Sequence, residues 1–252
     1  MTGRERRLLR MLCMTAGSGG GGGGDKPWEE MTWDEVIAAT KNGKYKNFEI
    51  GAMKELDLGT EGIIHMQIVG IDADDLADGS GKAPLTFISK ELLKTSHRMN
   101  PERTPSSTPY NEGTGSVGGW DKSEMKQYIL NTVIMSVPEI IRNSVKAVTK
   151  YTRTANTYGE FVQEETTETF WLASRREMLG DVANAETQGP IYHEAFPDDE
   201  SRTKKKPSAT NTDAWWLRSA GNAKGFYFIY TNGTSIFDTA HKSYAIALGF
   251  CL

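Results

Sequence analysis

Apolar and polar positions alternate with helical and strand periods along residues 28–252, and this pattern predicts one folded region. Thr32 and Glu35 have the spacing of a capping box, and the apolar residues behind them share one helical face. Gly43 is placed to end that helix. In residues 62–71 both alternating faces are largely apolar, which predicts a strand in the centre of a sheet.

Two further helices are predicted after a long loop. The loop, residues 99–119, is rich in Pro, Ser, Thr, Asn and Gly, which favour turns over regular structure. Asp121 is placed to cap the first helix, and Pro138 suits the first turn of the second. We expect the second helix to end within residues 145–150. The apolar stripes that predict these helices are Met125, Tyr128, Ile129 and Val133 in the first, and Ile140, Ile141, Val145 and Val148 in the second.

The other apolar runs are short and predict strands. A capping box at Ser174 and Glu177, closed by Gly180, predicts a short helix among them. Asn232 and Gly233 form a strong hairpin signal. Together these elements predict an α+β fold with mainly antiparallel strands and two to four helices. The predicted strands are residues 48–51, 62–71, 85–88, 170–173, 214–219, 225–231, 234–238 and 244–251.

The first 24 residues differ in composition from the rest. Residues 1–14 interleave arginine with leucine and methionine, and residues 19–24 are all glycine. A glycine run holds no fixed conformation, so we expect a flexible tether. We therefore divide the chain into residues 1–24 and a domain of residues 25–252. The basic peptide is either a segment that docks on a partner or a frayed tail, and its tether suits a chain attached to something else.

Composition and charge exclude several classes of function. No apolar run approaches the roughly 20 residues of a membrane-spanning helix, so we expect no membrane insertion. The formal net charge of −4 leaves no excess of cations for phosphates, which argues against a nucleic-acid partner. Cys13 and Cys251 stand near opposite ends, and the four histidines are scattered, so we expect no metal and no cofactor. Cys251 is expected to be a buried, inert thiol.

Two charged segments each have a functional and a structural interpretation. The four aspartates within residues 72–78 could attract calcium, but Leu76 and Ala77 break the EF-hand pattern, so a solvated turn is favoured. Whether this loop binds calcium stays open. The lysines at 204–206 could attract an acidic partner, although a solvated loop is the favoured interpretation. No nucleophile motif argues for catalysis, and we expect no enzyme activity.

Aromatic residues concentrate towards the C-terminal end. Residues 211–252 hold nine of the 24 aromatics, so this segment is either the densest part of the core or a recognition surface. In the predicted strand at its centre, Phe226, Phe228 and Tyr230 share one face, and Tyr227 belongs to the other. Alternation establishes that the faces differ but not which one is outward. Exposure of the first face would favour ligand binding, whereas burial of both faces would favour a structural role.

Three motifs in a fixed order resemble one known group of proteins. They are Gly118-Gly119-Trp120, Phe170-Trp171-Leu172-Ala173-Ser174 and Trp215-Trp216-Leu217-Arg218-Ser219. They resemble the C-type-lectin-fold domains of unknown function found in phages, prophages and gut bacteria, which are similar to the variable proteins of diversity-generating retroelements. The resemblance covers about residues 28–252 and implies a C-type-lectin-like fold. We then expect at least three of the four tryptophans in these motifs to be buried.

The resemblance also implies where a ligand is bound. In that family the segment after the Arg-Ser motif is diversified and displayed, which corresponds here to residues 220–244, within an expected C-terminal ligand-display segment of residues 214–252. The chain lacks the proline that usually precedes the last strand, so its end is expected to differ. It also lacks the calcium-dependent sugar motifs of true C-type lectins. Formylglycine-generating enzymes share a related fold, but Cys13 and Cys251 do not supply their reactive cysteines, which leaves an enzyme of that type as a weak alternative.

The leading hypothesis is a non-enzymatic receptor-binding module on a phage or prophage particle, or on a bacterial cell surface. The alternative is a structural virion protein, such as a decoration or fibre-tip subunit. The expected partners are a host cell-surface protein or glycan, other virion proteins bound through the N-terminal peptide and, as one option, two further copies in a homotrimer. The candidate ligand-binding residues are Asn222, Lys224, Phe226, Phe228, Tyr230, Asn232, Thr234, Ser235 and Phe237.

Overall fold

The computed structural model describes residues 26–103 and 108–252. Its contacts divide the chain into Met1–Glu30 and Met31–Leu252. The described part of the first unit holds one 3-10 helix, η1 (Trp28–Glu30). The predicted basic peptide and glycine tether lie outside the described residues. All the other described elements belong to the second unit.

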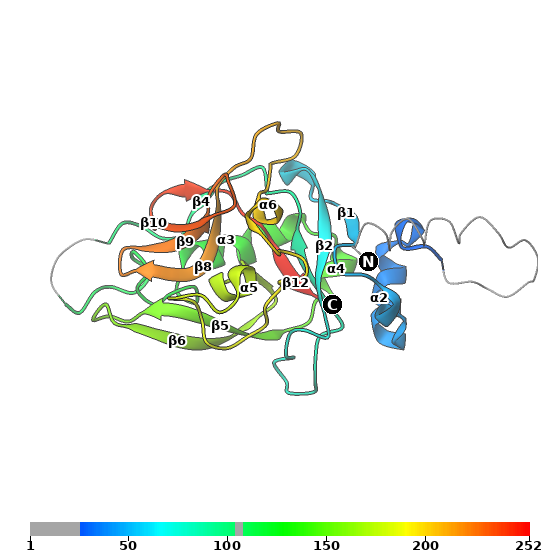
Figure 1. Cartoon of the computed structure of the whole chain (residues 1–252), viewed down its shortest axis with the longest axis horizontal. Helices are drawn as coiled ribbons and strands as arrows, with labels where there is room; N and C mark the ends of the chain where they lie inside the picture. Colours follow the sequence, from blue (N-terminus) through cyan, green and yellow to red (C-terminus); the bar gives the residue numbers. More distant parts are fainter. Residues whose placement is uncertain (1–25, 104–107) are drawn as a thin grey trace, which may run out of the picture. The chain divides into compact units, whose positions relative to one another are not determined.

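A five-stranded antiparallel sheet runs through the second unit (Figure 1). β2 lies between β1 and β3, which confirms the central strand that its two apolar faces predicted. The strand nearest the end of the sequence, β12, pairs with both β3 and β7 and so joins distant parts of the chain. The strands in sheet order are β1 (Met53–Asp57), β2 (Ile63–Ile71), β3 (Leu85–Ser89), β12 (Gly249–Cys251) and β7 (Phe170–Trp171).

Three smaller antiparallel sheets complete the fold. The three-stranded sheet has the order β10-β9-β8, with β10 at its edge. β5 and β6 pair along their whole length into a hairpin arm, and β5 packs beside β8 (Figure 1). The bounds are β4 (His97–Arg98) with β11 (Ser243–Tyr244), β5 (Val148–Ala155) with β6 (Phe161–Glu168), and β8 (Trp215–Asn222), β9 (Gly225–Ile229) and β10 (Ser235–Thr239).

The structure confirms both capping boxes that the sequence predicted. Thr32 and Glu35 form the complete capping box of α2, which ends at a left-handed Gly43. Ser174 and Glu177 form the box of α5, which Gly180 follows. No helix among residues 26–103 and 108–252 has the length and hydropathy that a bilayer crossing requires. The helices are α2 (Trp33–Asn42), α3 (Glu124–Asn131), α4 (Glu139–Arg142), α5 (Arg175–Leu179), α6 (Asp199–Arg202), η2 (Lys44–Asn47), η3 (Gly59–Glu61) and η4 (Val133–Ser136).

The core is built around the motif tryptophans. Trp120, Trp171, Trp215 and Trp216 are all fully buried, which confirms the expectation for at least three of them. The fold is therefore α+β with mainly antiparallel strands, as predicted, although the described residues hold five α-helices rather than two to four.

Three predicted elements have different bounds in the structure. Residues 48–51 form a turn instead of a strand, because Gly51 takes a left-handed conformation and Ala52 N–H donates back to Glu49. Ser123, not Asp121, caps α3 by accepting a hydrogen bond from the Lys126 N–H. The predicted strand at 244–251 is split into β11 and β12, so the end of the chain departs from one continuous strand.

The largest difference concerns the β5–β6 arm, which the sequence pattern missed. Residues 145–150 were expected to end a helix, but α4 is short and Val148 begins β5. The inward-facing side of β5 is polar: Lys150, Thr152 and Thr154 are almost completely buried. A strand whose buried face is polar lacks the apolar alternation that identifies strands. Its buried polar side chains are tolerated because they bind partners distant in sequence.

Candidate functional site

Lys150 lies at the centre of a fully buried ionic network. Its Nζ is 2.6 Å from Asp74 Oδ1, 2.8 Å from Glu177 Oε1 and 2.8 Å from Tyr192 OH. It also lies 3.5 Å from the centre of the Trp171 ring. Arg218 adds two hydrogen bonds to Glu177, at 2.6 and 2.8 Å. We call Asp74, Lys150, Glu177, Tyr192 and Arg218 the core ionic network.

The charges within the core ionic network compensate one another. Burial alone would raise the pKa of Glu177, but the Arg218 guanidinium and the Lys150 ammonium outweigh it and lower that pKa to about 2. Burial alone would lower the pKa of Lys150, but the carboxylates of Asp74 and Glu177 raise it. The network joins β5, α5 and β8 to the loop that holds Asp74. It is closed to solvent, and its hydrogen bonds tie these elements together in the core.

The aspartate-rich loop at residues 72–78 is only partly solvated. A solvated turn was favoured for the loop, and this is wrong for Asp74, which is fully buried and accepts hydrogen bonds from Thr86 at 2.5 Å and from Tyr192. Its neighbour Asp75 is exposed.

Cys251 is a free, fully buried thiol, as predicted. Burial and the adjacent Asp74 carboxylate raise its pKa well above the ordinary value.

The favoured interpretation of the lysine run is wrong for Lys204. Its side chain is buried, with Nζ donating to the carbonyl of Ser89 and lying 5.3 and 5.4 Å from the rings of Phe196 and Trp215. Lys205 is exposed, as a solvated loop requires. The buried position follows from a backbone bridge between Lys204 and Asp213, which directs alternate side chains into the core.

The polar residues of the Arg-Ser motif organise the site region. While Arg218 belongs to the core ionic network, Ser219 Oγ donates to the buried carboxylate of Glu186 at 2.5 Å. The same hydroxyl accepts a hydrogen bond from the N–H of Arg175 at 2.8 Å. Glu186 also accepts from the N–H of Arg153 at 2.9 Å. These hydrogen bonds fix the backbone of Arg153 and Arg175 relative to the motif, and so they fix where the two side chains start.

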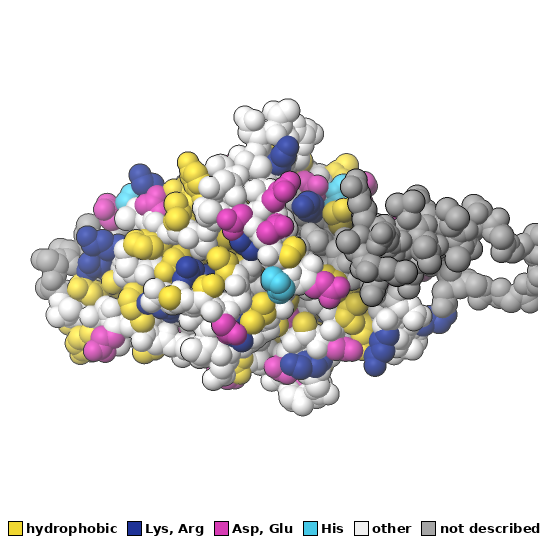
Figure 2. All heavy atoms as spheres, in the orientation of Figure 1, with side chains coloured by type: hydrophobic (Ala, Val, Ile, Leu, Met, Phe, Trp, Pro, Cys, Tyr) yellow, Lys and Arg dark blue, Asp and Glu magenta, His cyan; other side chains and the backbone are white. Residues whose placement is uncertain are grey.

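Two arginines stack on aromatic rings between β5–β6 and β8–β10, where Phe161 and Phe237 are exposed and Tyr227 is buried beneath them at 6% exposure. The Arg153 guanidinium lies 3.5 Å from the Phe161 ring centre, and that of Arg175 lies 4.2 Å from the Tyr227 ring centre. Tyr227 and Phe237 pack edge to face at 5.9 Å. We call these five residues the arginine–aromatic surface. Figure 2 shows Lys and Arg side chains among hydrophobic ones over this part of the molecule.

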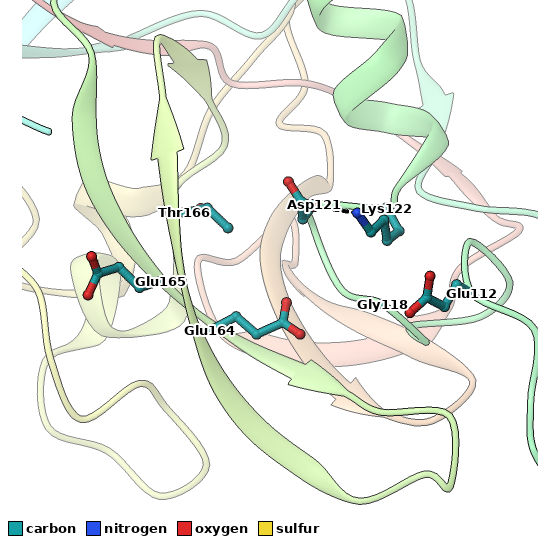
Figure 3. A pocket seen from close by; sticks show the side chains of 7 residues that line it. All are labelled: Glu112, Gly118, Asp121, Lys122, Glu164, Glu165 and Thr166. Carbon is teal, nitrogen blue, oxygen red and sulfur yellow. Dashed lines mark ion pairs between the residues drawn. The ribbon is translucent and has the colours of Figure 1, made fainter.

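A second feature is a polar pocket of about 320 Å³ beside the Gly-Gly-Trp motif. Asp121 is 3.0 Å from Lys122 and also 3.0 Å from Lys126, which in turn is 2.7 Å from the buried Glu168. Glu164 points towards the Asp121–Lys122 side, whereas Glu165 points away (Figure 3). The pocket is lined by Glu112, Gly118, Asp121, Lys122, Glu164, Glu165 and Thr166.

Close packing requires a glycine beside the pocket, and the carboxylates determine the charge of the pocket. Gly119 must be glycine, because a Cβ there would lie 2.1 Å from Thr154 Oγ1 on β5 and its φ is positive. Burial, followed by the carboxylates of Asp121 and Glu112, raises the pKa of Glu164. Such a pocket suits a positively charged group. Within the part of the chain that the structure describes, no three His, Cys, Asp or Glu side chains are grouped as metal ligands.

The structure separates the nine predicted ligand-binding residues into two groups. Phe226 and Phe228 are 0% and 3% exposed, so the expectation that they form an outward ring surface is wrong. β8 and β10 cover both edges of β9, and layers on both faces bury it. Tyr230 and Phe237 are exposed, as the hypothesis requires. The other predicted residues are exposed or half-buried around the same hairpin: Asn222, Lys224, Asn232, Thr234 and Ser235.

The apolar pattern of the sequence did not predict the two arginines or the β5–β6 arm. Arg153 stood in a segment without an apolar period, and Arg175 was assigned only to a capping box. The sequence did hold one signal: along β5, outward residues such as Tyr151 and Arg153 alternate with buried ones. This alternation becomes recognisable only once Lys150 and Thr152 are known to face the core.

Residues 85–252 match the family described as a domain of unknown function, DUF6273. No curated protein and no solved structure matches the chain. The matched segment contains the Gly-Gly-Trp and Arg-Ser motifs, the arginine–aromatic surface and the pocket. Because the match spans well over half of the sequence, this chain belongs to the DUF6273 family.

Proposed function

We propose that this protein is a non-enzymatic ligand-binding module of a phage or prophage particle, with a C-type-lectin-like fold, and that it binds a host cell-surface ligand beside the β9–β10 hairpin. The observation that carries the proposal is the exposure of three large side chains on this hairpin. Tyr230, Ile236 and Phe237 are 47%, 45% and 50% exposed. By strand register Tyr230 and Ile236 lie on the Phe228 face of the hairpin and Phe237 lies on the Tyr227 face, so exposed apolar side chains flank the hairpin on both faces. Exposed apolar side chains of this kind are typical of recognition surfaces.

The burial of β9 supports this use of the hairpin. β9 pairs with β8 along one edge and with β10 along the other, and all five of its residues are buried. The exposed side chains are therefore presented by a rigid element, and little conformational entropy is lost when a ligand contacts them. Phe226 and Phe228 belong to the scaffold in this proposal.

The position of the ionisable groups supports a function without catalysis. The groups with strongly shifted pKa values in the core ionic network, among them Glu177 and Tyr192, are about 1% exposed. Lys150 of this network packs against the buried Trp171 ring, and none of these groups is open to solvent. The exposed hairpin offers contact area instead of reactive groups.

A flow-cytometry experiment tests the proposal. The labelled full-length chain is incubated with a panel of gut bacterial isolates and compared with the Tyr230→Ala and Phe237→Ala variants. The Met135→Ala variant is the control, because Met135 is 65% exposed on η4. We expect the wild type to label a subset of strains, the hairpin variants to lose at least about tenfold of that labelling, and the control to retain it. Equal labelling by all variants would contradict a hairpin site.

One observation favours the alternative of a structural virion protein. Both faces of β9 are buried, so much of the aromatic C-terminal segment serves the core. If the wild type labels no strain, the structural alternative gains support. It then predicts that particles carrying the Phe237→Ala chain assemble and adsorb to cells like wild-type particles.

A further inference from the structure

Arg153 and Arg175 lack ionic partners among the residues that the structure describes. Arg153 donates to the carbonyls of Ala220 and Gly221, and Arg175 donates to the carbonyl of Ala183. Nε of Arg175 is buried without a hydrogen-bond partner. Four other arginines are paired with carboxylates: Arg98 with Glu124, Arg176 with Asp181, Arg202 with Asp199 and Arg218 with Glu177.

The neighbouring carboxylate does not serve these guanidinium groups. Glu186 accepts hydrogen bonds from backbone N–H groups of Arg153 and Arg176 and from Ser219 Oγ. Burial lowers the pKa of Arg153 most strongly, Tyr227 and Glu186 oppose this in part, and the positive charge of Arg175 adds a smaller lowering effect. Two like charges held close together without a direct counter-ion favour an anion that binds to both.

The rings on either side form one continuous surface with these arginines. Phe161 and Phe237 are 40% and 50% exposed. Gly221 joins them: its carbonyl accepts from Arg153, and a Cβ at this position would lie 2.4 Å from the Cβ of Phe237. Gly221 therefore brings the Arg153 guanidinium, which stacks on Phe161, to the neighbourhood of Phe237.

The geometry selects a ligand that lies across the face of the sheet. A peptide paired with the free edge of β10 would lie beyond β10, three strand spacings, roughly 14 Å, from β8, whose carbonyls hold Arg153. Its carboxylates would be too distant for direct contact with that guanidinium. The net charge of −4 disfavours a nucleic acid, whose attraction depends on an excess of cations.

We propose that the arginine–aromatic surface binds an acidic polysaccharide of the uronic-acid type. The planar guanidinium groups match carboxylates, and the C–H faces of the sugar rings pack on Phe161 and Phe237 as other apolar groups pack on aromatic rings. This inference rests on the proposed function, because it assigns the ligand class of the surface that adjoins the hairpin.

Biolayer interferometry with the immobilised full-length chain tests this assignment. The probes are alginate oligomers, neutral dextran of similar length, poly-L-glutamate and oligo(dT). We expect alginate to bind with an affinity that falls with added salt, and dextran not to bind. The Arg153→Gln/Arg175→Gln double variant should lose at least about tenfold in affinity, while Arg142→Gln, on α4, should match the wild type.

Two further variants keep the test decisive if the double variant is misfolded. Arg175→Lys retains the charge but removes the planar fork, and Phe161→Ala removes a half-exposed ring; each should weaken alginate binding at an unchanged melting temperature. Absence of alginate binding, or unchanged binding by these variants, overturns the inference. Binding of poly-L-glutamate or oligo(dT) through the same arginines, without alginate, also overturns it. If the hairpin variants still reduce cell labelling, the proposed function survives that failure.

Discussion

Replacing Lys204 by methionine should stabilise the protein although it removes a hydrogen bond. Lys204 is 2% exposed, and its Nζ donates to the carbonyl of Ser89 between the rings of Phe196 and Trp215. None of the described carboxylates forms an ion pair with it. A buried ammonium without a counter-ion is costly, because the aromatic rings and one carbonyl replace only part of its hydration.

The pKa of Lys204 sets the size of the effect. Burial lowers it from 10.5 to about 7, and the positive charge of Lys90 acts in the same direction, against a smaller effect of Glu91. At about 1.36 kcal/mol for each pH unit, this corresponds to about 5 kcal/mol lost at pH 7 relative to a lysine of ordinary pKa. The lost hydrogen bond to Ser89 costs about 1 kcal/mol. We expect a net gain of about 4 kcal/mol.

The pH dependence has a definite sign. Between pH 7 and 10.5 the unfolded chain holds a proton on this amine that the folded chain has released. The wild type therefore becomes more stable relative to the Lys204→Met variant as the pH rises through this window. The advantage of the variant is complete below about pH 7 and should shrink by about 2.7 kcal/mol between pH 7 and 9.

Urea denaturation followed by tryptophan fluorescence at pH 7, 8 and 9 measures this difference. Lys205→Met is the matched control, because Lys205 is exposed and adjacent in sequence; its free energy of unfolding should stay within about 0.5 kcal/mol of the wild type. A Lys204→Met chain that is less stable than the wild type at pH 7, or an advantage equal at all three pH values, would refute the reasoning.

Three other predictions concern the core and the N-terminal segment. Trp171→Ala should lower the free energy of unfolding by about 3–5 kcal/mol, because it empties a buried site beside Lys150; an unchanged melting curve contradicts this. Glu177→Gln should cost about 3–5 kcal/mol, since Lys150 and Arg218 lose a shared counter-ion. The wild type should lose that contribution as the pH falls from about 4.5 towards 2, whereas the variant should not, as acid titration followed by circular dichroism will show. Deleting residues 1–24 should leave the denaturation midpoint unchanged, and a lower midpoint would mean that the segment packs on the domain.

The structure revises how the aromatic C-terminal segment is understood. Its motif tryptophans and β9 form the core, and its large exposed side chains lie at the hairpin tip and on the edge strand. The arginine–aromatic surface therefore includes residues from a second part of the chain. The β5–β6 arm supplies Arg153 and Phe161, which lie more than 60 residues before the hairpin in the sequence.

The sequence by itself determined the features that depend on neighbouring residues. The capping boxes at Thr32 and Ser174, the left-handed Gly43 and the hairpin around Gly233 all depend on interactions within a few residues. The central strand at 62–71 was also predictable, because burial on two faces requires apolar side chains on both. These local rules established the α+β class, whereas the burial of the motif tryptophans was expected from the family resemblance.

Only the tertiary structure decided the features that depend on distant partners. β5 could not be recognised because its buried face is polar, and Lys150 and Thr152 are satisfied by Asp74, Glu177 and Arg218 from other parts of the chain. The burial of both faces of β9 could not be predicted either. Alternation separates the two faces of a strand, but the layers that pack on it decide which face is covered. The position of the arginine–aromatic surface follows from the contact of β5 with β8, and no local pattern encodes a contact between strands that lie so far apart in sequence.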